Sequence, residues 1–176
     1  MDFYRVLGLG PKLQLNSVEL QQLFYGRSRE LHPDRFARAE PSVRAAALEE
    51  SSLLNDAYRT LKDPVSRAEY FLKHRGFDIG EQGTKDVPPE LLEEVFELNM
   101  ALEELKSGDE SARPQLATAR DHFAALLAQS DDELTNLFAA HDASPAEAVL
   151  RQIRGVLNRR RYIKNLLRDV NGYLSN

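Results

Sequence analysis

Prolines and helix caps divide this chain of 176 residues into a series of helical patterns, and this punctuation limits the folds open to it. The first long pattern has Asn16 or Ser17 as its N-cap and carries apolar residues at helical spacing. It must end at Leu31 or His32, because Pro33 pushes the residue before it out of the α region. β-Branched residues are sparse and alternating patterns are absent, so the sequence predicts an all-α fold.

Two further helices follow in the first half of the chain. One begins near Pro41, a favourable first-turn residue, and carries one apolar stripe of Val43, Ala47, Leu54, Ala57, Tyr58 and Leu61. The next has Asp63 as its cap, Pro64 at its first helical position and Gly76 as its C-terminal stop. These stripes predict that the helices on either side of Pro33 pack together as an antiparallel hairpin.

A glycine-containing segment separates the two halves of the chain. Residues 76–88 hold three glycines and no periodicity, and we interpret 77–88 as a linker. The sequence therefore predicts an N-terminal helical domain at 1–76 and a C-terminal three-helix bundle at 89–176.

The three helical patterns of the second half are longer than those of the first. The first begins at the prolines of 88–89 and is broken by residues 107–111. The second runs from about 113 to 141. The third begins at Pro145, with Ser144 as its expected cap.

The composition excludes several classes of function. Without cysteine, the chain can form no disulfide, no thiolate metal site and no Cys nucleophile. The net charge of −5 argues against binding to nucleic acid. The N-terminus lacks the basic region of a signal peptide, and no apolar run approaches the ~20 residues that span a bilayer. We expect a cytoplasmic protein without a metal, a cofactor or a membrane partner.

His32, Pro33 and Asp34 lie in the turn between two helices, where they support no core. They could form an acid–base pair, half of a metal site, a rigid contact loop for another protein, or only a polar helix stop. The other histidines lie on other segments without ligand spacing, and Pro33 is expected to turn the side chains of its two neighbours apart. As a contact loop, the turn is stiffened by Pro33, so little conformational entropy is left to lose on binding.

These residues and their surroundings resemble the J-domain of DnaJ-type co-chaperones. The resemblance rests on "DFYRVLGL", a helix ending in "HPDRF" and a helix ending in "NDAYRTLKDPVSRAEY". The last segment and the "GFD" after it are closer still to the HscB family, the dedicated co-chaperones of iron–sulfur cluster assembly. The resemblance is dense over residues 1 to about 78, and it implies a helical hairpin with short flanking helices.

The resemblance also implies a function for the turn. In this family the J-domain docks on an ATP-dependent chaperone of the DnaK/HscA class, where His32, Pro33 and Asp34 would accelerate ATP hydrolysis by the partner. The chain itself would then be no enzyme. Arg29 and Arg35 are the basic residues expected to attract the acidic surface of that chaperone.

The segment "PPELLEEVFELNMALEEL" resembles the first C-terminal helix of HscB, which holds the iron–sulfur scaffold protein IscU. Its expected core stripe is Leu91, Leu98, Leu102 and Leu105. Leu92 and Phe96 are four residues apart and turned off that stripe, with Glu97 and Glu104 beside them. Such an arrangement is typical of a small hydrophobic hot spot with a polar rim, although the two apolar residues could also widen the buried stripe.

The last helix supplies a second element of the scaffold-binding face. By the family pattern, Arg161 and Tyr162 align with an aromatic–arginine pair that contributes to scaffold binding. The arginine run 159–161 points in directions about 100° apart and lacks an aromatic platform, so we expect it to be a solvated face. The resemblance implies a chain that engages chaperone and IscU-like scaffold at once, and we expect this chain to be a monomer. The alternative is a J-protein whose C-terminal bundle self-associates or binds an unrelated client.

Overall fold

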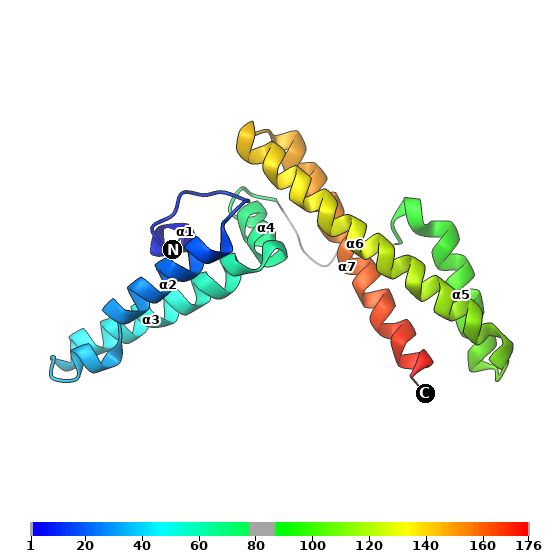
Figure 1. Ribbon diagram of the computed structural model, residues 1–176, viewed down its shortest axis with the longest axis horizontal. Coiled ribbons are helices and arrows are strands. Elements are labelled where there is room, and N and C mark those ends of the chain that lie inside the picture. Colours follow the sequence, from blue (N-terminus) through cyan, green and yellow to red (C-terminus); the bar gives the residue numbers. More distant parts are fainter. Residues whose placement is uncertain (1, 78–86, 176) are drawn as a thin grey trace. The chain divides into compact units, whose positions relative to one another are not determined.

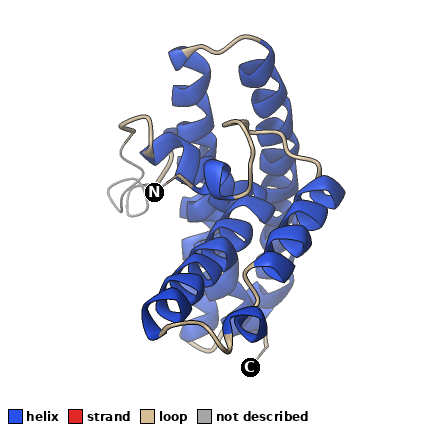
Figure 2. Ribbon diagram, turned by 90° about the vertical axis from the view of Figure 1, so that its left-hand side faces the viewer, coloured by secondary structure: helices blue, strands red, loops and turns tan. Residues whose placement is uncertain are grey.

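The computed structural model describes residues 2–77 and 87–175, and builds them from helices and loops (Figure 1). Within these two ranges the regular elements are α-helices and short 3-10 helices, with no strand (Figure 2), so the predicted all-α fold is confirmed. No helix in the described part of the chain is both long enough and apolar enough to cross a membrane.

The chain divides into two compact units. The first comprises Met1–Phe77 together with His141–Ser144, and the second comprises Asp78–Ala140 together with Pro145–Asn176. Most of the linker expected at 77–88 lies outside the described residues.

The first unit is built around a helical hairpin. It contains α1 (Phe3–Val6), α2 (Ser17–Glu30), the 3-10 helix η1 (Pro33–Phe36), α3 (Pro41–Lys62) and α4 (Pro64–Lys73). α2 and α3 lie side by side with η1 at their junction, while α1 and α4 pack at the opposite end of the hairpin (Figure 1). The hairpin therefore presents η1 at the end that is only two helices thick.

Side-chain caps fix the helix boundaries of this unit. Asn16 Oδ1 accepts the backbone N–H groups of Val18 and Glu19, at 2.9 and 3.1 Å. Asp63 Oδ1 accepts the backbone N–H of Ser66 at 2.7 Å. Gly76 has a φ of +79°, a conformation that suits a helix C-terminus and that side chains rarely adopt. The predicted starts and stops of these helices are confirmed.

The core of the first unit gathers residues from all four helices and the loop before α2. Its largest fully buried side chains are Leu7, Leu13, Leu54, Leu61, Phe71 and Leu72. Val43, which the sequence placed on the buried stripe of α3, is exposed. It lies in the first turn of α3, at the thin end of the hairpin, where no third helix covers it (Figure 1).

A buried arginine joins the loop before α2 to the end of α3. Arg67 donates from Nε to the carbonyl oxygen of Leu13 and from Nη1 to that of Leu61, both at 2.7 Å. Its burial lowers the pKa of the guanidinium group. The carboxylate of Asp142 accepts the backbone N–H groups of Leu13 and Gln14, at 3.0 and 2.7 Å. The backbone of Leu13 is thus held at both its carbonyl and its N–H group.

The second unit is a three-helix bundle. α5 (Leu92–Lys106), α6 (Arg113–Ala143) and α7 (Glu147–Leu174) contribute to it, and the 3-10 helices η3 (Pro89–Leu91) and η4 (Glu110–Ala112) precede α5 and α6. The three helices share one core of Leu91, Val95, Leu98, Ala101, Leu102, Leu116, Phe123, Ile163, Leu167 and Val170.

The start of α7 differs from the prediction. Its N-cap is Ala146, which has an extended backbone and makes no side-chain cap hydrogen bond. Ser144 was expected to cap this helix, but it lies two residues before the N-cap, and Pro145 stands outside the helix. A hydroxyl at that distance is not placed to accept the second or third N–H of the helix.

Candidate functional site

The His-Pro-Asp turn is held in shape by its own hydrogen bonds. His32 is the N-cap of η1, and its Nδ1 accepts the backbone N–H of Asp34 at 3.3 Å. Pro33 occupies the first helical position, and the N–H of Arg35 donates to the carbonyl of His32 at 3.0 Å. Because Nδ1 acts as an acceptor here, Nε2–H remains as the donor of the ring. The turn is preorganised without support from a core.

The side chains of the triad are close together, contrary to the prediction. His32 Nδ1 lies 3.5 Å from Asp34 Oδ2, because the cap bond draws the imidazole over the backbone of Asp34. The two side chains are 58% and 90% exposed. A partner protein can therefore reach the imidazole and the carboxylate together.

Four arginines lie before and after the turn in the chain. Arg27 and Arg29 end α2, Arg35 belongs to η1 and Arg38 follows it, and all four are exposed. Within the described residues none of them forms an ion pair. Their charge is thus available to attract an acidic surface, as the sequence predicts for Arg29 and Arg35.

A second candidate surface lies on the outer face of α5. Leu92, Phe96 and Met100 are 56%, 65% and 51% exposed, whereas Leu91 and Leu98 are buried. The alternative that Leu92 and Phe96 widen the buried stripe is thereby excluded. Met100 continues the row by one more helical turn; the spacing of four residues could have revealed it in the sequence.

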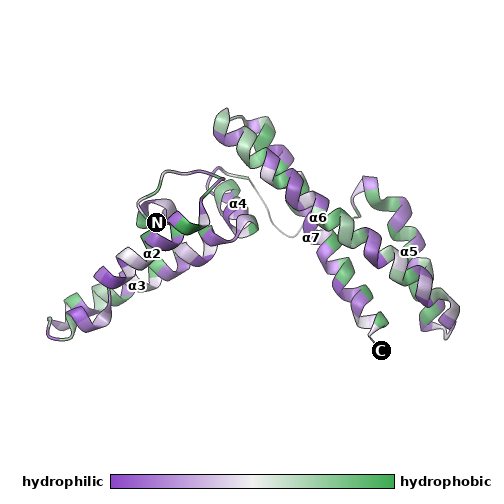
Figure 3. Ribbon diagram, in the orientation of Figure 1, coloured by the Kyte–Doolittle hydropathy of each residue, from purple (hydrophilic) through white to green (hydrophobic). Residues whose placement is uncertain are grey.

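The other predicted members of this surface are divided between two helices. Glu97 and Glu104 are exposed on α5, where hydrophobic and hydrophilic residues alternate along the ribbon (Figure 3). Tyr162, on α7, is half-buried and packs against the bundle core, and this burial raises the pKa of its phenol. Arg161 is half-buried and engaged in an interaction. The structure therefore exposes Leu92, Phe96 and the two carboxylates along α5, but it does not expose Tyr162 fully.

The arginine run of α7 is paired, so the prediction of a solvated face is wrong. Arg159 contacts Glu90 at 3.4 Å and also pairs with Glu133, and Arg160 Nε donates to Asp131 Oδ1 at 2.6 Å. Both arginines are half-buried. Carboxylates from η3 and α6 lie opposite the run and neutralise it, which leaves no basic stripe for nucleic acid.

Comparison with known proteins accounts for both units. Residues 2–70 match the DnaJ domain, and residues 87–171 match the HSCB C-terminal oligomerisation domain. The co-chaperone protein HscB homolog of Vibrio vulnificus strain YJ016 is 34% identical over 82% of this chain and 77% of its own length. The chain belongs to the HscB family of J-domain co-chaperones. The homolog of strain CMCP6 is 38% identical over 63% of this chain and 65% of its own.

Two solved HscB structures share the fold. The chaperone HscB from Vibrio cholerae has a TM-score of 0.65 and 26% identity, and the match covers 98% of this chain and 96% of the other. The human co-chaperone protein HscB has a TM-score of 0.69 and 23% identity, with 97% and 81% covered, and it supports the fold alone. The roles of individual side chains stay predictions.

Proposed function

We propose that this HscB-family chain links two proteins during iron–sulfur cluster assembly in the cytoplasm. Its J-domain docks on a chaperone of the DnaK/HscA class and stimulates ATP hydrolysis there, and its C-terminal bundle delivers an IscU-like scaffold to that chaperone. The observation that carries the proposal is the exposed, self-capped turn of His32, Pro33 and Asp34. The chain itself hydrolyses nothing.

The turn suits docking because its shape exists before the partner arrives. Pro33 and the cap bond of His32 fix the backbone, so binding orders few groups. Asp34 offers a carboxylate to a cation of the chaperone, and Arg29 and Arg35 attract the chaperone's acidic residues.

The scaffold binds the outer face of α5 in this proposal. Leu92 and Phe96 supply the apolar contact, with Glu97 and Glu104 as its polar rim. The family pattern adds Arg161 and Tyr162 from α7. We expect the protein to act as a monomer, in which one copy carries both docking surfaces.

Chaperone stimulation is tested with the steady-state ATPase of the DnaK/HscA-class chaperone. Asp34→Asn removes an exposed carboxylate from the turn, and Asp56→Asn removes a half-exposed carboxylate, paired with Arg59, from α3 as its control. Stimulation is expected to fall at least tenfold in the first variant and to stay at the wild-type level in the control. Equal stimulation by both variants contradicts the role of the turn.

Scaffold binding is tested by calorimetric titration with the apo scaffold. Phe96→Ala removes an exposed ring from α5, and Leu48→Ala removes an equally exposed side chain from α3. A hot-spot residue contributes about 2 kcal/mol, so affinity is expected to fall about thirtyfold for Phe96→Ala and not at all for the control. If the wild type does not bind, a J-protein with a different client or with a self-associating bundle becomes the better explanation. Sedimentation equilibrium distinguishes these two, because only the self-associating bundle forms oligomers.

A further inference from the structure

Met100 carries one of only two sulfur atoms in the chain. The sequence has no cysteine, and its two methionines are Met1 and Met100. The side chain of Met100 is 51% exposed on α5, so solvent reaches its thioether. Oxidants that attack sulfur in proteins normally react first with thiolates, which are the stronger nucleophiles. No thiol competes in this chain, so such oxidants are left with the thioethers.

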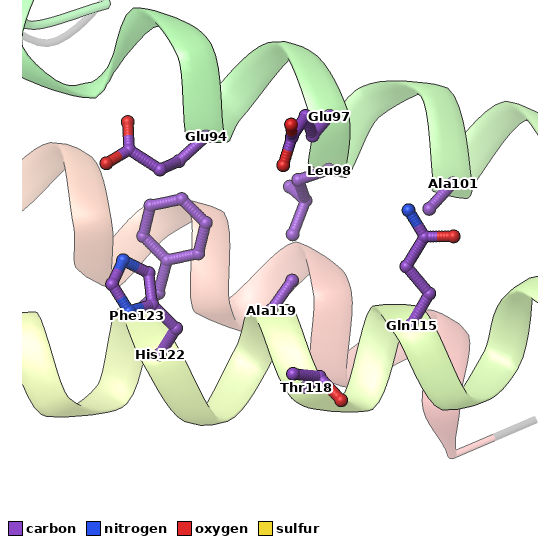
Figure 4. Close-up of a pocket in the computed structure, with 9 residues that line it drawn as sticks. All are labelled: Glu94, Glu97, Leu98, Ala101, Gln115, Thr118, Ala119, His122 and Phe123. Carbon is purple, nitrogen blue, oxygen red and sulfur yellow. The ribbon is translucent and has the colours of Figure 1, made fainter.

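The thioether lies on a side of α5 that faces away from the bundle core. Leu98 and Ala101 point toward α6, where they line a cavity between the two helices (Figure 4). Met100 instead continues the exposed row of Leu92 and Phe96, at intervals of four residues. A change of polarity at Met100 therefore alters the surface of this row and leaves the buried core of the bundle intact.

Oxidation of the thioether by hydrogen peroxide is a two-electron oxygen transfer. A lone pair of the Met100 sulfur attacks one oxygen of the peroxide, the O–O bond breaks, and after a proton shift the products are methionine sulfoxide and water. The sulfur is oxidised and the peroxide is reduced, so no further reactant is needed. The step replaces an apolar thioether by a polar S–O group that accepts hydrogen bonds.

The neighbours of Met100 on α5 offer this new oxygen no hydrogen-bond donor. The positions three and four residues away are those of Phe96, Glu97, Glu103 and Glu104. A phenyl ring has no N–H or O–H group, and an ionised carboxylate only accepts hydrogen bonds. The sulfoxide therefore takes its hydrogen bonds from water, and an apolar partner surface that covers it leaves its oxygen unpaired.

We propose that Met100 is a redox-sensitive site at which hydrogen peroxide weakens the docking of the scaffold on α5. The unmodified thioether adds apolar area to the row of Leu92 and Phe96, whereas the sulfoxide brings an oxygen that docking leaves without a donor. Methionine sulfoxide reductases, one for each epimer, restore the thioether and make the loss reversible. This inference rests on the proposed function, because it names a regulation of the surface that binds the scaffold.

The test compares the affinity for the apo scaffold before and after peroxide treatment. Wild type and Met100→Leu are treated with hydrogen peroxide, catalase removes the excess, and peptide mapping by mass spectrometry measures the sulfoxide. Untreated scaffold is then titrated calorimetrically. Oxidised wild type is expected to bind about tenfold more weakly than its untreated form, and sulfoxide reductases are expected to restore the affinity. Met100→Leu retains Met1 and every other oxidisable side chain, so its own affinity should change less than about twofold on treatment.

The outcomes separate this inference from the proposed function. If wild type with sulfoxide at Met100 binds the scaffold as tightly as the untreated protein, the redox site is overturned and the scaffold role stands. Equal losses in wild type and Met100→Leu also overturn it, because the sensitive group then lies elsewhere, and so does a thioether that peroxide leaves unmodified. If the untreated wild type does not bind the scaffold, the proposed function itself fails, and this inference fails with it.

Discussion

Replacement of Arg67 by methionine is expected to destabilise the first unit more than any surface substitution. Arg67 is 6% exposed, and its guanidinium group donates to two backbone carbonyls at 2.7 Å. One of these carbonyls, that of Leu61, belongs to the last turn of α3, where the helix supplies no donor. A positive charge at a helix C-terminus also interacts favourably with the helix dipole. Methionine preserves the volume of the side chain but donates nothing.

The size of the effect follows from these two bonds. A hydrogen bond to a charged group contributes about 1.5–3 kcal/mol, so the two together amount to about 3–6 kcal/mol. The methionine variant no longer pays the desolvation cost of a buried guanidinium group, which offsets part of this loss. We therefore expect a net loss of stability of about 3 kcal/mol. For a domain of this size, the melting temperature falls by about 12–24 °C.

The matched control is Arg59→Met. Arg59 pairs with Asp56 at 2.8 Å, but its side chain is 81% exposed, so its loss costs less than about 0.5 kcal/mol. Hydrogen exchange with mass spectrometry reads the peptides of α1 to α4 separately from those of α5 to α7, which thermal melting of the whole chain does not. If the peptides of α1 to α4 exchange equally slowly in the Arg67 and Arg59 variants, the two hydrogen bonds to carbonyls contribute no net stability and the reasoning fails.

Three further predictions concern the same unit. Gly26→Ala is expected to stabilise α2 by about 0.5–1 kcal/mol, because a Cβ there meets no atom within 4 Å; an unchanged urea midpoint contradicts this. Asp142→Ala removes the acceptor of the Leu13 and Gln14 N–H groups and is expected to cost about 2 kcal/mol, seen as faster hydrogen exchange at both amides. Burial raises the pKa of the Tyr4 phenol above its ordinary value of 10.0. The unfolded chain therefore ionises first, and stability is expected to fall as the pH rises above about 10. In Tyr4→Phe, the decline in the urea midpoint between pH 8 and pH 11 should be smaller.

Local chemistry made the helix boundaries predictable. The caps at Asn16 and Asp63 and the restriction imposed by Pro33 act over two or three residues, so the sequence contains all of the information. Periodicity left the exposure of Leu92 and Phe96 open, because two apolar residues beside a core stripe can also widen it; the structure exposes both. Ser144 failed as a cap because Pro145 fits equally well just before a helix or at its start.

The error at the arginine run of α7 has a different cause, because it concerns charged side chains whose surroundings come from distant parts of the chain. Arg159 and Arg160 seemed solvated because nothing in α7 itself announces the carboxylates of Glu90, Asp131 and Glu133 opposite them. Periodicity also does not reveal that Glu94 lines a cavity, because this depends on how α6 packs against α5. Periodicity determines which side of a helix is buried, whereas charge pairing depends on the rotation and offset of two packed helices.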